Sequence, residues 1–400
     1  MKSFVWIIDF NVVLQSFLTG GVWVVLFCLN CLYARPWEDY IRNLRVKHFK
    51  ISLLVLFLII NINSFISAQE VNSDHNNINI FSHNTESDNP IKNFQALISA
   101  GIGKMSGHTT YQIGGTTKDP SGTYELHDPL SELMFPIEIY TINLDASFFF
   151  FQNFNSNLSF KTNITDRTGN MEDRDWGIPW EKPTGSGVYY WYGPDHLDVY
   201  SESKTDMTLY IFNLDLLYEV YRNNFSSCNT DFQIYAGLGY LYQEFDFECR
   251  LIRQYDLRGD DVPVDQQLNF EGDGSVGLTY NVKSHIPYLE ISSLLIYDQN
   301  ILLKANIGYS PYVMVNDRDN HKLRNKISKA ECTGSSLLFS FAGSYFFENN
   351  IFIKGQFDYV KVDTEGKQKQ YENGSWSATI DQKNFSERNS LDISAGYVFN

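Results

Sequence analysis

The stretch YTINLDASFFF, from Tyr140 to Phe150, decides the fold class, because apolar and polar residues alternate along it. In an extended chain, successive side chains point to opposite sides, so a period of two residues indicates a β-strand with one apolar and one polar face. The apolar face holds Tyr140, Ile142, Leu144, Ala146 and Phe148, and the polar face holds Thr141, Asn143, Asp145 and Ser147.

The same alternation recurs as far as the end of the chain. It is clear over 301–310 and 351–359, and again over 391–399, where Leu391, Ile393 and Tyr397 alternate with polar or small residues. No helical periodicity of comparable length follows the first ninety residues. We therefore predict an all-β protein.

Composition excludes several classes of protein. The 400 residues are 16% aromatic, with 30 Phe and 25 Tyr, which argues against an intrinsically disordered chain. With 31 Lys and Arg against 47 Asp and Glu, the formal net charge of −16 gives no general attraction to nucleic acid. The five cysteines lack the paired spacing of a zinc site.

Residues 46–68 have the features of a secretory signal peptide. Basic residues from Arg45 to Lys50 precede a short apolar run over 51–60, and Ala68 offers a small residue for cleavage. The polar segment 69–93 is expected to be a flexible lead-in to a barrel domain over 94–400. Residues 1–45 are either an upstream extension of the gene model, with translation starting near Val46, or an N-terminal membrane anchor.

Alternating strands suit either a soluble sandwich or a transmembrane barrel whose apolar face contacts lipid. The aromatic excess, the signal peptide and a last strand that ends in an aromatic residue favour the barrel. Ten strands are predicted, an even number that suits a closed antiparallel barrel. They lie near 95–105, 131–150, 158–165, 207–220, 232–249, 277–296, 301–315, 335–346, 350–362 and 390–399.

The connections between these strands alternate in length. Short turns are predicted near 152–157, 221–231, 298–300 and 347–349, and long loops over 106–130, 166–206, 250–276, 316–334 and 363–389. Long loops on the extracellular side and short turns on the periplasmic side are typical of bacterial outer-membrane barrels. The sequence thus predicts a ten-stranded antiparallel transmembrane β-barrel in the outer membrane.

Two of the predicted long loops carry closely spaced acidic residues. One contains Asp173-Arg-Asp175 and the other contains Asp317-Arg-Asp319-Asn-His321. Either alone is most often a solvated turn, but the predicted topology brings both loops to one rim. A His beside a carboxylate is a competent general base for a water, and two adjacent carboxylates can hold a proton or orient that water.

With these residues the chain resembles the omptins, the outer-membrane endopeptidases of Gram-negative bacteria. The resemblance covers most of 95–400 and includes Gly103-Lys-Met-Ser-Gly107, Gly169-Asn-Met171, and Ile286-Pro-Tyr288. It implies four catalytic residues, which by motif are Asp173, Asp175, Asp319 and His321. His321, oriented by Asp319, would activate a water that Asp173 and Asp175 position, and no metal would be required.

The resemblance also implies binding partners. Omptins cleave peptides and proteins next to basic residues; Asp317 matches one acidic residue of the pocket for the basic side chain, whereas Tyr111 occupies the place of the second. Omptins further need lipopolysaccharide, and Tyr242, Glu244 and Lys283 match that lipid site, where Asp246 replaces an Arg. The expected active site faces the extracellular side, and no nucleic acid is expected.

Other interpretations remain open at this point. An omptin-like barrel that no longer cleaves and acts as an adhesin or structural protein is the main alternative, and a general porin is a weaker one. Cys249 and Cys332 fall toward the same rim and are a less favoured disulfide pair.

Overall fold

The computed structural model describes residues 95–150, 153–177, 179–181, 188–190, 196–225, 229–257 and 268–399. The predicted signal peptide, the lead-in and residues 1–45 lie outside these ranges. Within the described ranges, no helix has the length and apolar character needed to cross a membrane.

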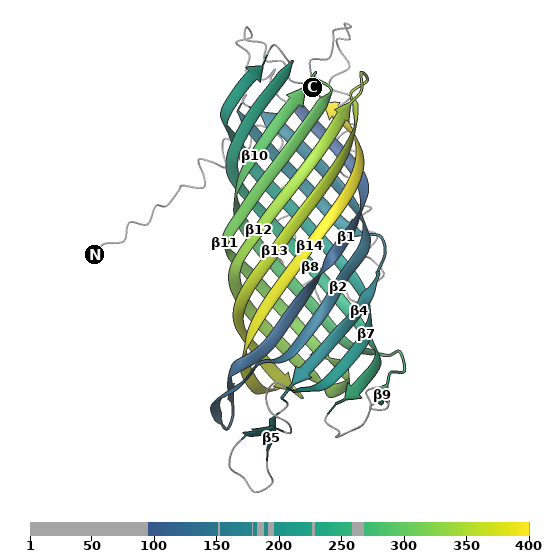
Figure 1. Cartoon of the computed structure of the whole chain (residues 1–400), viewed down its shortest axis with the longest axis vertical. Helices are drawn as coiled ribbons and strands as arrows, with labels where there is room; N and C mark the ends of the chain where they lie inside the picture. The colour runs from purple at the N-terminus through teal and green to yellow at the C-terminus, as the bar shows by residue number, and fades with distance from the viewer. Residues whose placement is uncertain are drawn as a thin grey trace, which may run out of the picture. The chain divides into compact units, whose positions relative to one another are not determined.

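All but two of the described strands belong to one antiparallel sheet, which closes on itself (Figure 1) with ten strand positions around the ring. β3 and β4 share a position between β2 and β7, with residues 164–166 separating them. The ring consists of β1 (Gln95–Asp119), β2 (Gly122–Phe150), β3 (Phe154–Asn163) with β4 (Arg167–Trp176), β7 (Leu197–Phe225), β8 (Thr230–Asp256), β10 (Val276–Tyr297), β11 (Ile301–His321), β12 (Lys326–Phe346), β13 (Ile351–Glu372) and β14 (Ser375–Phe399).

The first and last strands of the ring pair directly, in a register that runs from Ala96 opposite Phe399 to Lys118 opposite Thr379. This pairing leaves no open sheet edge, as a barrel in lipid requires. Short elements lie outside the ring: β5 (Pro179–Glu181) pairs with β6 (Val188–Tyr190), and β9 (Leu268–Glu271) pairs with β8. The prediction of a ten-stranded antiparallel barrel is confirmed.

The predicted strand ends were wrong at the long-loop side of the barrel. Most of each predicted long loop is strand except in 250–276, so that β1 and β2 continue to a turn at residues 120–121 and β13 and β14 meet at Asn373-Gly374. Both residues of the latter turn have positive φ, 49° and 82°, as a two-residue hairpin requires. The predicted short turns at the opposite end are confirmed at residues 298–300 and near 347–349.

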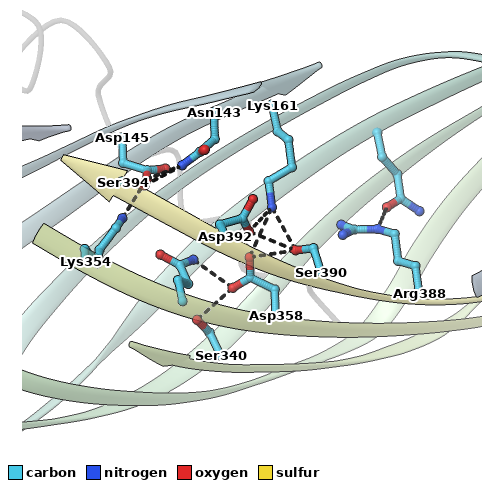
Figure 2. A network of polar contacts seen from close by, with 12 residues as sticks. Asn143, Asp145, Lys161, Ser340, Lys354, Asp358, Arg388, Ser390, Asp392 and Ser394 are labelled. Carbon is cyan, nitrogen blue, oxygen red and sulfur yellow. Dashed lines mark hydrogen bonds and ion pairs between the residues drawn. The ribbon is translucent and has the colours of Figure 1, made fainter. Parts of the chain in front are cut away.

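The exposed face and the interior differ in polarity as the alternation predicted. On β14, Ile393 is 69% exposed whereas the adjacent Asp392 is 2% exposed. Figure 2 shows the buried polar network inside the barrel. Lys161 lies 2.7 Å from Asp392 and 3.4 Å from Asp358, and Lys354 lies 2.6 Å from Asp145. Each of these five charged side chains therefore has a partner of opposite sign, whereas Arg388 in the same view donates to the amide oxygen of Gln243.

The polarity reverses part of the way along the strands. On β2, the inward residues are apolar from Leu133 to Ile139 and polar at Thr141 and Asn143. The outward residues change in the opposite sense, from the polar Glu138 to the exposed, apolar Tyr140 and the residues after it. One part of the barrel therefore has an apolar outer surface for lipid and a polar interior. The other part has a polar outer surface and an apolar interior, as in a water-soluble barrel.

Candidate functional site

The predicted catalytic residues lie on two strands in the part of the barrel that has an apolar interior. Asp173 and Asp175 belong to β4, and Asp319 and His321 belong to β11. These residues were predicted on loops, which is wrong: the strands continue through both segments because their outward side chains contact water and need not be apolar. Alternate residues of each strand therefore point to the interior.

Asp319 and His321 form a close pair. His321 Nε2 lies 2.7 Å from Oδ2 of Asp319, whose side chain is 2% exposed against 21% for His321. Because Nε2 faces the carboxylate, it carries the hydrogen in a neutral ring, and the lone pair of Nδ1 is left to accept a proton. The hydroxyl of Tyr111 on β1 donates to the same Oδ2 at 2.7 Å.

Asp173 and Asp175 are close enough to this pair for their charges to interact. Burial raises the pKa of Asp173 well above its usual value, and the charges of Asp175 and Asp319 raise it further. Burial also raises the pKa of Asp175, against a hydrogen bond from Ser131 and the charge of His321. The structure thus brings together all four predicted catalytic residues, and the acidic pair retains a proton more readily than free carboxyl groups do.

Asp317 lies on the same inward face of β11, two residues before Asp319, and is 6% exposed. Its Oδ2 accepts hydrogen bonds from Asn384 at 2.8 Å, from the Tyr280 hydroxyl at 3.1 Å and from Gln382. Burial raises the pKa of Asp317 to about 6 despite these bonds. The carboxylate is therefore surrounded by polar side chains of the protein itself.

An aromatic cluster supports the site. The rings of Phe135 and Tyr280 stack at 4.6 Å, and Tyr111 and Phe247 lie 5.1 Å and 6.3 Å from Tyr280. All four side chains are buried and belong to the larger of two apolar clusters in the described structure. These rings fix the backbone positions from which the polar residues project.

Two basic residues near the acidic groups were missed in the sequence. Lys326, the first residue of β12, is opposite His321 in the β11–β12 register, and burial lowers its pKa while the charge of Asp319 raises it. Arg324 belongs to the short helix η5 (Lys322–Arg324), and its charge lowers the pKa of Asp173. Their position follows from the tight β11–β12 connection, which the sequence analysis treated as a long loop.

A second His–Asp pair lies at the start of β7. Nδ1 of His196 is 2.9 Å from Oδ1 of Asp198, whose side chain is 1% exposed. Both residues lie within the predicted long loop 166–206 and were not predicted as a pair. The i, i+2 spacing that drew attention to Asp319 and His321 is also present here and was the available signal.

The residues predicted to bind lipopolysaccharide lie together on the outer wall. Glu244 on β8 accepts a hydrogen bond from Tyr242 at 2.9 Å and lies 3.4 Å from Nζ of Lys283 on β10. Asp246, two residues further along β8, is exposed. The predicted cation of this site is therefore already paired with a carboxylate.

In the described part of the chain, no group of His, Cys, Asp or Glu residues has the arrangement of a metal site. Cys249 and Cys332 are both buried free thiols, so the less favoured disulfide between them is not formed. Burial raises the pKa of each thiol to about 12.

The fold and site describe a bacterial outer-membrane β-barrel with acidic and histidine side chains gathered near one end. The model of the Omptin family matches residues 98–400, and the chain belongs to this family. A comparison with curated protein sequences finds no match.

Solved structures of outer-membrane barrels are similar to the chain. The outer membrane protease OmpT from Escherichia coli matches with a TM-score of 0.55 and 16% identity, over 79% of this chain and 100% of that one. OprG from Pseudomonas aeruginosa matches with a TM-score of 0.33 and 11% identity, over 76% of this chain and 96% of that one.

Proposed function

We propose that the protein is an outer-membrane endopeptidase that hydrolyses peptide bonds with an activated water. The observation that carries this proposal is the Asp319–His321 pair, joined at 2.7 Å, within electrostatic reach of Asp173 and Asp175 on the facing strand. Membership of the Omptin family and the fold of an outer membrane protease support it. By analogy with outer-membrane barrels, the site faces the extracellular side.

In the proposed mechanism, Nδ1 of His321 removes a proton from a water as the water attacks the carbonyl carbon of the substrate. Asp319 stabilises the imidazolium that forms, since its carboxylate already accepts the Nε2 hydrogen. The imidazolium then donates its proton to the leaving amine. The protein supplies no covalent nucleophile in this scheme.

Asp173 and Asp175 have a different role in the mechanism. The raised pKa values of both residues favour a state in which the pair holds one proton. A protonated carboxyl donates a hydrogen bond to the oxyanion of the tetrahedral intermediate, and the ionised one orients the water. Oδ1 of Asp173 and Oδ1 of Asp319 are buried and have no partner among the described residues, so both are available to a bound water.

We further propose that the substrates are peptides or proteins with basic residues beside the cleaved bond. Asp317 adds its negative charge to those of Asp319 and of the singly protonated Asp173–Asp175 pair, and such a concentration of charge attracts cationic substrates over several ångströms. Because Asp317 is buried, it acts on a substrate through its charge rather than by direct contact.

Lipopolysaccharide is proposed as an activating lipid that contacts Tyr242, Glu244 and Lys283 on the outer wall. Lys283 would bind a lipid phosphate in exchange for its present contact with Glu244. Since Asp246 lies on the same face, this contact is expected to be weak and salt-dependent.

The test uses the full chain purified in detergent, with and without added lipopolysaccharide, and a library of quenched peptides with single and paired basic residues. His321→Ala should lower kcat by about a thousandfold or more, because it removes the general base. His196→Ala is the matched control, since it removes the histidine of the other His–Asp pair.

Three outcomes would decide against parts of the proposal. A folded wild-type barrel that cleaves no peptide with or without the lipid would favour an adhesin or structural protein. Loss of cleavage in His196→Ala but not in His321→Ala would identify His196, of the His196–Asp198 pair, as the general base. Equal cleavage of basic and neutral peptides would contradict the substrate preference.

A further inference from the structure

Asp319 has two hydrogen-bond partners at a single oxygen atom. The Tyr111 hydroxyl donates to Oδ2 at 2.7 Å, and Nε2 of His321 lies 2.7 Å from the same oxygen. Tyr111 is on β1 and Asp319 is 208 positions further along the chain, on β11, so the barrel wall brings them together. The three residues form a continuous chain of hydrogen bonds that ends at the base of the proposed mechanism.

We infer that Tyr111 is a positioning residue for the Asp319–His321 pair, holding the carboxylate in the orientation that receives the Nε2 hydrogen. This inference rests on the proposed function and goes beyond it. The resemblance to omptins assigned this position to the substrate pocket, but the hydroxyl points at the proposed catalytic pair instead.

Tyr111 is held rigidly enough for such a role. It is 2% exposed, and its ring packs against Phe135 and Tyr280 with centroid distances of 6.2 Å and 5.1 Å. Burial, followed by the charge of Asp319, raises the pKa of Tyr111 well above its usual range. The hydroxyl therefore remains a protonated donor, and packing prevents it from turning to another acceptor.

The hydrogen bond matters most when His321 is neutral. In that state Asp319 is a buried carboxylate without an adjacent imidazolium, and its Oδ1 has no partner among the described residues. A buried anion depends strongly on its remaining hydrogen-bond donors. Removing the hydroxyl should therefore destabilise the form of the pair that acts as a base more than the protonated form.

The charged surroundings of the pair would persist in a variant of Tyr111. The acids near it are Asp173 and Asp175 of β4 and Asp317 of β11, and the bases are Arg324 of η5 and Lys326 of β12. The remaining titratable neighbours are Tyr280 of β10 and Cys249 of β8, and burial raises the pKa of both, so both stay neutral in the working pH range.

The experiment compares Tyr111→Phe with Tyr235→Phe in the full chain. Each variant loses one buried tyrosine hydroxyl; that of Tyr235 donates to Gln233 at 2.6 Å in the other apolar cluster. In Tyr111→Phe, the acid limb of the pH profile of kcat/KM should move to higher pH by about one unit, which corresponds to one hydrogen bond to a charged group. Maximal kcat should fall about tenfold from lost positioning. Tyr235→Phe should match wild type.

A second measurement does not depend on cleavage. In protein labelled with ¹⁵N-histidine, the imidazole N–H resonance of His321 is assigned by its absence in His321→Ala. Its chemical shift should change in Tyr111→Phe and not in Tyr235→Phe, because only the former alters the acceptor of that hydrogen.

The outcomes separate this inference from the proposed function. If wild type cleaves and His321→Ala does not, an unchanged pH profile in a folded Tyr111→Phe barrel overturns the inference alone. If nothing is cleaved, the proposed function fails, and the His321 resonance still decides: an unchanged shift overturns the hydrogen-bond chain, and a changed shift supports it.

Discussion

The raised pKa of the buried Asp317 predicts a specific dependence of barrel stability on pH. Burial raises its pKa from 3.8 to about 6, so between these values the folded state binds more protons than the unfolded state. Stability from this group is therefore greatest below about pH 4 and is lost as the pH rises to about 6. A shift of roughly two units corresponds to about 3 kcal/mol at neutral pH.

The variant Asp317→Asn carries no charge at any pH and removes this dependence. The free energy of unfolding of the variant minus that of wild type should rise by about 3 kcal/mol between about pH 4 and about pH 7. Urea unfolding in phospholipid vesicles, followed by tryptophan fluorescence across this pH range, measures the difference. Any offset that does not vary with pH reports the altered hydrogen bonds and leaves the prediction unaffected.

Asp381→Asn is the matched control because the sign is opposite. Burial alone would raise the pKa of Asp381, but Lys367 at 3.0 Å and the amide of Thr116 hold it below its usual value. Its contribution is therefore present at neutral pH and lost as the pH falls, so this variant should be relatively less stable toward higher pH. A difference for Asp317→Asn that stays constant with pH would refute the reasoning.

Three further predictions concern the barrel and the chemistry. Lys161→Met removes the cation that Asp358 and Asp392 share and leaves both as buried charges. The free energy of unfolding, measured by urea titration, should fall by about 3–5 kcal/mol. No loss of stability would mean that water solvates the network. Ile393→Arg should lower the free energy of unfolding in vesicles by about 2–4 kcal/mol, because it places a charge on the lipid-facing surface. The control Leu323→Arg, at a similarly exposed site on η5, should change it by less than about 0.5 kcal/mol. Equal losses would contradict the assigned lipid surface. Chelation of divalent ions should leave peptide cleavage unchanged, and recovery of activity only on adding a metal would refute the metal-free mechanism.

The number and pairing of the strands followed from local alternation, because a transmembrane strand must present apolar residues to lipid at every second position. Ile393 and Asp392 illustrate this rule directly. The strand ends did not follow from it. In the part of β2 before Tyr140 the inward residues are apolar and the outward Glu138 is polar, which is the reverse of the pattern from Tyr140 onward. Nothing in the local sequence marks this change of which face is apolar.

Only those residues of the site whose spacing along one strand places them on the same face could be predicted from the sequence. Asp319 and His321 are two positions apart on one strand, so both point inward, and the resemblance to a family supplied their partners on β4. Tyr111 and Lys326 could not be placed in the same way. Tyr111 reaches Asp319 from a strand far away in sequence, and the position of Lys326 depends on the short β11–β12 connection.

The polarity reversal fixes the height of the site relative to the bilayer. On β11 the last exposed apolar residue is Met314, and His321 lies seven positions further along the strand. At about 3.3 Å per residue and a tilt of about 40°, this separation amounts to roughly 18 Å along the membrane normal. The barrel wall thus holds the site at a fixed distance from the lipid surface. A polypeptide anchored in the same membrane can place at the site only a peptide bond that lies at this distance from its own anchor. A freely diffusing peptide has no such constraint.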